Sequence, residues 1–407
     1  MSKATCAFML AGCCASLLAS AAPLEAQTPA SKQPIHLRLV YLGKNYREPT
    51  PLSFLDQVVG DKGIAGARVG TADNNITGKF INQETDLAED ILPEQADIVP
   101  EAKKVLDAGN RLIIADLEPT DLLAVADLPE AKDAIILDVR TSDDTLRGAQ
   151  CRGNIFHLSP SNAMRADALG QFLLYKKWTH WFFVHGVKPA DLDYVAAVRR
   201  AASRFGARIV AERNYTYDAR TRDTDTGHQQ TEQQMALLTQ SLPDYDVIFV
   251  VDEDEAFGDY LLFNSTDPRP VVGTQGLVAA AWHPAFTEFS GKEMQRRFVR
   301  LSHRTMTERD YEAWLGVRIF GEAMLRTGAT DAKTLRDYIL SDKFTIAAFK
   351  GEGLSFRRWD QQLRQPILLV GPRALVSIAP IEGFLHPRFN TDTLGYDEPE
   401  TKCHALK

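Results

Sequence analysis

The strongest constraint on the fold of this chain is an alternation of strand-like and helix-like runs that is completed twice. The first series extends from His36 to Leu158, and the second from Ala163 to Val272. Strands that alternate with helices form βαβ units and hence parallel sheets. The sequence therefore predicts an α/β protein with two doubly wound parallel-sheet blocks in series.

The expected elements of the first block follow from apolar runs, helix-start prolines and stop glycines. Its strands are expected at 36–42, 67–72, 112–115, 134–137 and 155–158. Its helices are expected at 51–59, at 100–108 and from residue 120.

The second block is expected to be built in the same way. Its helices are expected at 163–175, 190–205, 231–241 and from residue 256, and its strands at 181–184, 208–212, 247–251 and 271–272. Residues 218–227 are expected to form a polar loop.

The remainder of the chain does not begin a third block. It supplies three helices, at 293–303, 310–326 and 332–341, and then a strand pair, 353–359 with 365–369, that turns at 360–362. Helices without strands followed by strands without helices are typical of a chain that crosses back to complete each earlier block. We therefore expect two lobes joined by a multi-crossover hinge, with a ligand cleft between them. The expected boundaries are 34–156 plus 280–345 for lobe 1, 157–279 plus 346–390 for lobe 2, and 391–407 for a C-terminal tail.

The N-terminus predicts export. Lys3 precedes an uncharged run from Ala4 to Ala22 that is rich in small residues, which is typical of a signal peptide cleaved after Ala22 or Ala26. Residues 1–26 are taken as this segment. An alternative is the lipobox-like stretch that ends at Cys13, which would leave a lipid-anchored protein.

Cysteine usage agrees with an oxidising compartment. Cys151 and Cys403 are the two cysteines outside the N-terminal segment. They are candidates for one disulfide, with two free thiols as the alternative.

Composition and motifs limit the functional classes. The formal charge of −8 argues against nucleic-acid binding, which needs clustered Lys and Arg. The sequence contains no Gly-x-Ser-x-Gly, His-Glu-x-x-His, phosphate-loop or Cys-x-x-Cys motif, so we expect a protein that is not an enzyme and needs no cofactor.

Three apolar strands run directly into acidic loops. These junctions lie at 111–118, 134–144 and 246–255. In open α/β sheets, ligands bind beyond the carboxyl ends of the strands. The acidic loops therefore predict where a ligand binds.

Two pieces of the chain carry a resemblance to a known family. Residues 310–317 look like its aromatic helix, and residues 349–362 look like its late Gly-Phe-Asp-Gln hairpin. The chain resembles the type I periplasmic binding proteins typified by Leu/Ile/Val receptors of ABC importers. Residues 72–80, 267–273, 384–386 and 392–399 look like a subgroup that accompanies PQQ-dependent alcohol oxidation systems.

The resemblance implies a periplasmic, monomeric solute receptor that closes on a small molecule and delivers it to ABC permease subunits. A periplasmic sensor of ligand or metal with the same fold stays open as an alternative. An exported hydrolase or metal-dependent enzyme would require a nucleophile with its base, or a complete ligand set.

The family's ligand contacts carry over only in part. Thr141 and Ser142 match hydroxyls that bind an amino-acid carboxylate, but Arg140 and Asp143 are added, and Gln275 replaces an acid for the ammonium group. The remaining candidates are acids of the junction loops and two residues after the first strand: Asp116, Glu118, Asp252, Glu253, Asp254, Asn45 and Tyr46. Clustered acids indicate a cationic ligand or hard metal ion. The alternative is that each acid caps a helix N-terminus.

Overall fold

The computed structural model describes residues 34–49, 51, 58–217 and 224–406. The predicted signal peptide and Cys13 lie outside the described residues. So do most of the predicted helix at 51–59 and part of the predicted loop at 218–227.

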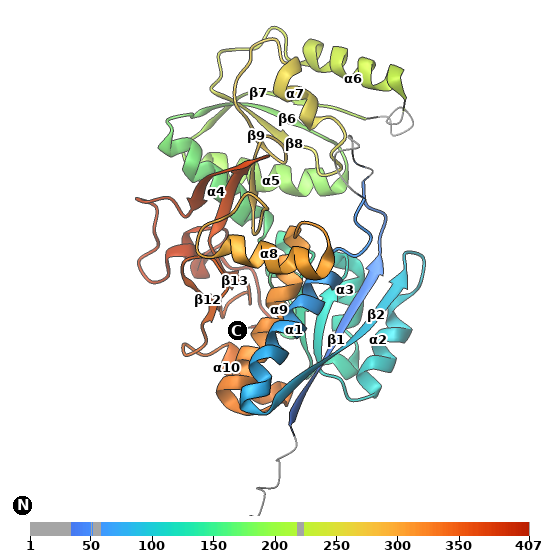
Figure 1. Ribbon diagram of the computed structural model, residues 1–407. Helices are drawn as coiled ribbons and strands as arrows, with labels where there is room; N and C mark the ends of the chain where they lie inside the picture. The colour runs from blue at the N-terminus through green and yellow to red at the C-terminus, as the bar shows by residue number, and fades with distance from the viewer. Residues whose placement is uncertain (1–33, 50, 52–57, 218–223, 407) are drawn as a thin grey trace, which may run out of the picture. The chain divides into compact units, whose positions relative to one another are not determined.

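A parallel sheet forms the first block (Figure 1). Among the described residues its strand order is β2-β1-β3-β4-β5. The strands are β1 (Ile35–Asn45), β2 (Gln83–Pro93), β3 (Leu112–Asp116), β4 (Ile135–Asp138) and β5 (Ile155–His157). Side chains alternate across it: Leu37, Leu39 and Tyr41 of β1 join one buried cluster, while Val40 and Leu42 join the cluster on the opposite face.

Helices cover both faces of this sheet. They are α1 (Ile64–Ile81), α2 (Ile98–Asp107), α3 (Pro119–Ala126), α9 (Glu308–Thr327) and α10 (Ala332–Ile339). The apolar residues of α1, α9 and α10 lie in the cluster of Leu37, and those of α2 and α3 in the cluster of Val40. The late helices therefore return to the first block, as the sequence predicted.

The predicted strand at 67–72 is wrong, because these residues lie inside α1. The helix packs closely on α9, and its glycines make that approach possible (Figure 1). A Cβ atom at Gly66 would lie 1.8 Å from the carbonyl oxygen of Asp310, and one at Gly70 would lie 2.9 Å from that of Trp314. The apolar run at 67–72 is thus part of a helix whose small residues allow close packing on α9.

The true second strand is β2, which the sequence analysis missed. β2 lies at the edge of the sheet and pairs only with β1 among the described strands. Most of its side chains are exposed or half-buried, so it carries little of the apolar signal of the inner strands.

The second block contains a mixed sheet. Its order among the described residues is β15-β14-β10-β9-β8-β6-β7. The strands are β6 (His180–His185), β7 (Arg208–Asn214), β8 (Val247–Val251), β9 (Val271–Gly273), β10 (Leu277–Ala280), β14 (Ile367–Gly371) and β15 (Ala374–Ala379). Strands β6 to β10 are parallel, and β14 is antiparallel to both of its neighbours.

Helices cover both faces of this sheet as well (Figure 1). They are α4 (Asn162–Tyr175) and α5 (Pro189–Arg204) on one face, and α6 (Asp225–Leu238) and α7 (Leu261–Asn264) on the other. The helix expected from residue 256 is only a 3-10 turn at Gly258–Tyr260 followed by the short α7. Helix α8 (Gly291–Ser302) joins the first block through Met294 and Phe298.

The predicted turn at 360–362 is present, but the strand that follows it and pairs with β12 (Gly353–Phe356) is not the run at 365–369. β12 pairs with the short β13 (Leu363–Arg364), and β11 (Ile346–Ala347) completes this small antiparallel sheet. The run at 365–369 leaves the hairpin and forms β14 between β10 and β15. Pro366 separates the two pairings.

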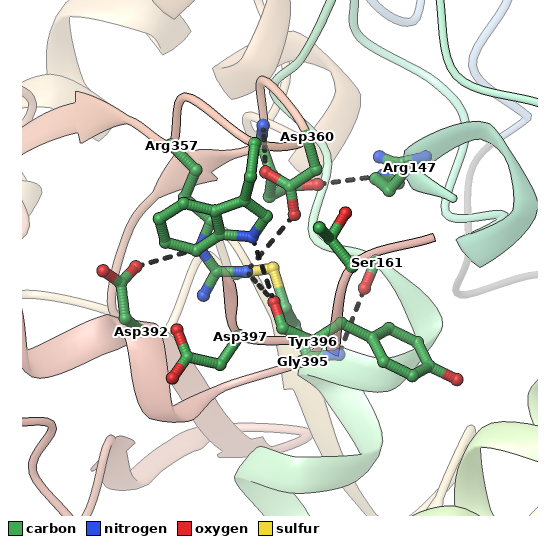
Figure 2. Close-up of polar contacts among 12 residues, drawn as sticks. Arg147, Ser161, Arg357, Asp360, Asp392, Gly395, Tyr396 and Asp397 are labelled. Atoms are coloured by element: carbon green, nitrogen blue, oxygen red, sulfur yellow. Dashed lines mark hydrogen bonds and ion pairs between the residues drawn. The ribbon is translucent and has the colours of Figure 1, made fainter. Parts of the chain in front are cut away.

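The tail is held by buried charges and by a covalent bond. Asp392 accepts hydrogen bonds from Arg357 Nε at 2.9 Å (Figure 2) and from Arg364 Nε at 2.8 Å. The Gly395 N–H donates to Asp167 on α4 at 2.9 Å. The sulfurs of Cys151 and Cys403 are bonded. The tail therefore contacts α4 of the second block and is fixed covalently to a loop of the first.

None of the described helices combines the length and apolar character needed to cross a membrane.

Candidate functional site

Two neighbouring cavities lie where the strands of the first sheet end. The first, here called the central cavity, encloses about 410 Å³. Its lining residues are Lys62, Val139, Arg140, Ser142, Ser159, Pro160, Arg165, Glu253, Glu255, Thr307, Glu308, Arg309 and Glu312. The second, here called the strand-1 cavity, encloses about 360 Å³ and shares Lys62, Arg140 and Arg309 with the first. Both blocks contribute to the central cavity, since Arg165 and Glu253 follow strands β5 and β8.

The first acidic junction is neutralised within the protein. Asp116 is buried at the end of β3 and accepts a hydrogen bond from the Tyr41 hydroxyl at 2.7 Å. Its Oδ1 lies 3.1 Å from Arg140 Nη1 and 3.7 Å from Arg309 Nε. Asp116 thus lies beside two guanidinium groups, both of which also pair with Glu48.

Arg140 brings several predicted site residues together. Its guanidinium stacks on the Tyr46 ring at 4.6 Å, and its Nη2 lies 3.9 Å from Glu118 and 3.5 Å from Glu48. Asn45, Tyr46, Asp116 and Arg140 all line the strand-1 cavity, whereas Glu118 is half-exposed outside it.

The β4 loop is organised around a fully buried acid, Asp138. Its Oδ1 accepts hydrogen bonds from the backbone N–H groups of Arg140 and Thr141 at 3.1 and 3.0 Å. The Thr141 hydroxyl donates to Asp138 and accepts from Arg147 Nη1 at 3.2 Å. Thr141 therefore shapes the loop with its hydroxyl, while Ser142 lies on the wall of the central cavity.

His157 closes this network from β5. Its Nδ1 lies 2.8 Å from Asp138 Oδ2. Burial and the charge of Arg147 lower the pKa of His157 to about 4. Burial opposes ionisation of Asp138, but the His157 hydrogen bond and the nearby Arg147 charge hold its pKa below the usual value. The pair is thus a carboxylate beside a neutral imidazole.

We expect His157 to make the protein less stable in acid. Its ordinary pKa of 6.5 falls to about 4 on folding, so between these values the unfolded chain binds the proton more readily. The free energy of unfolding should therefore decrease as the pH falls through this range, by up to about 3 kcal/mol from this group. Urea denaturation of the wild type at several pH values measures the loss.

The matched variant is His157→Gln, which keeps a donor for Asp138 and cannot titrate. Asp144, whose pKa burial raises to about 6, acts in the opposite direction in the same range, so the difference between wild type and variant isolates His157. The same pH dependence in both proteins would contradict a buried neutral imidazole.

The second-block acids also have partners inside the protein. Asp252 Oδ2 accepts from the N–H groups of Phe257 and Gly258 at 2.7 and 2.8 Å. Glu253 lies 3.4 Å from Arg165, and Asp254 pairs with Lys188. Asp252 thus orders the turn before α7, as the capping alternative implies.

Two further predicted residues have local structural contacts. Asp143 caps the 3-10 turn Asp144–Arg147 by accepting from the Thr145 N–H at 2.7 Å. Gln275 is buried, donates to the Asp252 carbonyl at 3.0 Å and accepts from Thr274 Oγ1 at 2.6 Å. The predicted residues outside both cavities are Glu118, Thr141, Asp143, Asp252, Asp254 and Gln275. A direct ligand contact for these six stays a prediction.

The residues of α9 that line the central cavity are not among the site residues predicted from the sequence. Glu308, Arg309 and Glu312 occupy the first turns of this helix. The resemblance had drawn attention to the adjacent Asp310 and Tyr311, which was the available signal. Arg165, one turn into α4, belongs to no sequence motif that could have pointed to it.

Two glutamates of this wall, Glu308 and Glu312, interact with the buried Lys350. Glu308 accepts from the Ala281 N–H, and Glu312 Oε2 accepts from the Ser159 hydroxyl at 2.8 Å. Lys350 donates to the carbonyls of Ala281 and Pro366. Burial raises the pKa of both glutamates, with Glu308 adding to the effect on Glu312, and burial lowers the pKa of Lys350 to about 7.

The described residues contain no group of three or more His, Cys, Asp or Glu side chains placed to hold a metal ion. The acidic loops also have basic or backbone partners, so they no longer require a cation for charge balance. The charge of the acidic loops therefore no longer indicates a cationic or metal-containing ligand.

A family model described as "Periplasmic binding protein" matches residues 94–373. The chain belongs to the periplasmic binding protein family. This membership confirms the expected two-block α/β fold and places the protein among binding proteins. No curated protein sequence matches this periplasmic binding protein.

Solved structures share the fold of this periplasmic binding protein at low sequence identity. A periplasmic binding protein from Burkholderia mallei is 14% identical with a TM-score of 0.64, and the match covers 92% of this chain and 100% of the other. A branched-chain amino acid ABC transporter ligand-binding protein from Burkholderia xenovorans LB400 is 14% identical with a TM-score of 0.68, covering 91% and 100%.

A third structure is a solute-binding protein of an ABC transporter from R. palustris in complex with benzoate. It is 12% identical with a TM-score of 0.63, and the match covers 91% of this chain and 99% of the other. At these identities the likeness of this periplasmic binding protein to its neighbours concerns the fold.

Proposed function

We propose that this protein is the periplasmic solute receptor of an ABC importer, binding a small molecule in the central cavity and presenting it to the permease. The observation that carries the proposal is the composition of that cavity's wall. Loops of β4 and β8 and the start of α9 contribute to it, although they are far apart in the sequence. A ligand held there would contact both blocks at once, as ligand-driven closure requires.

The solved neighbours support the transport assignment. Two of them are described as ligand-binding or solute-binding proteins of ABC transporters, and one holds benzoate. A monomeric receptor serving PQQ-dependent alcohol oxidation stays a narrower prediction from the subgroup motifs. A sensor would close on its ligand in the same way. Uptake of the ligand that depends on the permease would distinguish a transport receptor from a sensor.

Thermal unfolding of the protein against a panel of small solutes tests the proposal. The panel comprises amino acids, amines, hydroxy acids, aromatic acids, PQQ and calcium. A ligand at 100 times its dissociation constant should stabilise the folded protein by about 2.7 kcal/mol. Ser142→Phe fills part of the central cavity and should remove the shift.

The control is Ser203→Phe, an exposed position on α5. This variant should keep the wild-type response to the same solute. An unchanged response in Ser142→Phe would place the ligand elsewhere, and the absence of any stabilising solute would count against a receptor function.

A further inference from the structure

The wall of the central cavity offers almost no apolar surface to a ligand. Eight of its thirteen lining residues are ionisable, and Ser142, Ser159 and Thr307 add hydroxyl groups. Only Val139 and Pro160 are apolar. Apolar ligand sites are lined mainly by hydrophobic and aromatic side chains. A branched aliphatic or phenyl group would find no matching surface here, so the wall favours a small, hydrophilic ligand.

Among the cavity's arginines, Arg165 is the least engaged by the protein. Its Nε and Nη1 make long contacts of 3.4 Å to the Ala279 carbonyl and to Glu253. By contrast, Arg309 Nη1 lies 2.6 Å from Glu48, and Arg140 Nη1 lies 3.1 Å from Asp116.

Stacking fixes the orientation of Arg165. Its guanidinium lies 4.9 Å from the centre of the Tyr194 ring. A planar guanidinium that is held in place but weakly hydrogen-bonded suits a carboxylate, which it binds through two parallel N–H···O bonds.

Glu312 supplies a second, different polar group. Glu312 is 3% exposed. Its Oε2 accepts a hydrogen bond from the Ser159 hydroxyl, whereas its Oε1 has no hydrogen-bond partner among the described residues. An unsatisfied buried polar atom costs about 1–3 kcal/mol. A ligand group that hydrogen-bonds to Oε1 would recover this free energy.

The charge state of Glu312 decides what that ligand group is. Burial and the neighbouring Glu308 raise its pKa well above the ordinary value, which favours the protonated carboxyl. A neutral carboxyl does not repel an anion, and it hydrogen-bonds to a hydroxyl as both donor and acceptor. It is a poor partner for an ammonium group.

The ionised acids near the cavity leave little room for an ammonium group either. Glu48 and Asp116 are bound by arginines or lysine, and Glu253 faces Arg165. The ammonium group of an α-amino acid would therefore compete with these basic side chains for the same carboxylates.

We propose that the ligand of the central cavity is a small hydroxylated carboxylic acid, with its carboxylate on Arg165 and a hydroxyl group at Glu312. This assignment rests on the proposed receptor function. It makes Arg165 and Glu312 the residues that determine specificity, and it moves the anion contact from the β4 loop to α4.

The experiment is calorimetric titration of the wild-type protein with glycolate, glycerate, tartrate and gluconate, and with leucine and benzoate as competitors of other chemistry. At least one hydroxy acid should bind, and leucine and benzoate should bind at least about 100-fold more weakly. Arg165→Met should weaken hydroxy-acid binding by at least about 100-fold. Arg165→Lys should recover part of the loss.

Arg326→Met is the matched control, because Arg326 is an exposed arginine on α9 that pairs with Glu322. It should leave the affinity unchanged. Glu312→Gln keeps a donor and an acceptor and should retain binding within about tenfold. Glu312→Leu should lose the preference for the hydroxylated acid over the analogue that lacks its hydroxyl groups, which is acetate for glycolate, propionate for glycerate, succinate for tartrate and hexanoate for gluconate. If Arg165→Met does not fold, Arg165→Lys and the Glu312 pair carry the test.

The outcomes separate this inference from the proposed function. Tight binding of leucine or benzoate, with no binding of any hydroxy acid, would overturn the inference and leave the receptor function standing. Unchanged affinity in Arg165→Met would also overturn it. Absence of binding by every solute of both panels would contradict the inference and the receptor function together.

Discussion

Replacing both Cys151 and Cys403 by serine is expected to lower the free energy of unfolding by about 4 kcal/mol. The bond joins residues 252 positions apart, and a cross-link over a long loop removes much of the conformational freedom of the unfolded chain. Both cysteines are buried, so the folded structure also loses a packed contact. Urea denaturation of the oxidised wild type and of the double variant measures the difference.

Reduction of the wild type with dithiothreitol provides the control. The reduced protein should unfold at the same urea concentration as the serine variant, and the reductant should leave the variant unchanged. Equal stability of the oxidised wild type and the double variant would show that the tail is held by its noncovalent contacts alone.

The second large effect is expected at Asp392. This carboxylate is 1% exposed and pairs with Arg357, which is also 1% exposed (Figure 2). It pairs as well with Arg364, which is 8% exposed. Asp392→Asn removes the nearest counter-charge of both buried guanidinium groups and leaves Arg357 with the more distant carboxylate of Asp360, at 3.8 Å. Loss of one partner of a buried ion pair costs about 3–5 kcal/mol. Denaturant unfolding should show a loss of this size.

Asp342→Asn is the matched control for this variant. Asp342 pairs with Arg358 at 3.1 Å, but both side chains are well exposed. An exposed pair contributes about 0–1 kcal/mol, so this variant should unfold almost as the wild type does. A loss of the same size in both variants would contradict the role assigned to burial.

The inner strands could be predicted because each is a continuous apolar run with its own boundaries. β8 is an example, since all of its residues are buried. The edge strand β2 lacked this signal because solvent covers most of its side chains. Residues 67–72 were misassigned because Gly66 and Gly70 serve contact with α9, more than 240 residues later in the chain. A local pattern does not contain such a partner.

The sequence indicated where the acidic junctions lie, but not the charges that surround them. The acidic junctions do end at the strand termini, and Asp116, Arg140, Ser142 and Glu253 reach the two cavities. Their charge could not be assessed without knowing that Arg309 approaches Asp116 from α9. Acids that look available along the sequence are thus neutralised by distant residues.

The bond between Cys151 and Cys403 also sets an order of events during biosynthesis. A ribosome makes Cys151 first and must add 252 further residues, including the whole second sheet, before the correct partner exists. Throughout this interval the Cys151 thiol can pair only with a cysteine of the N-terminal segment or of another molecule. The correct disulfide therefore forms only after the tail has been synthesised.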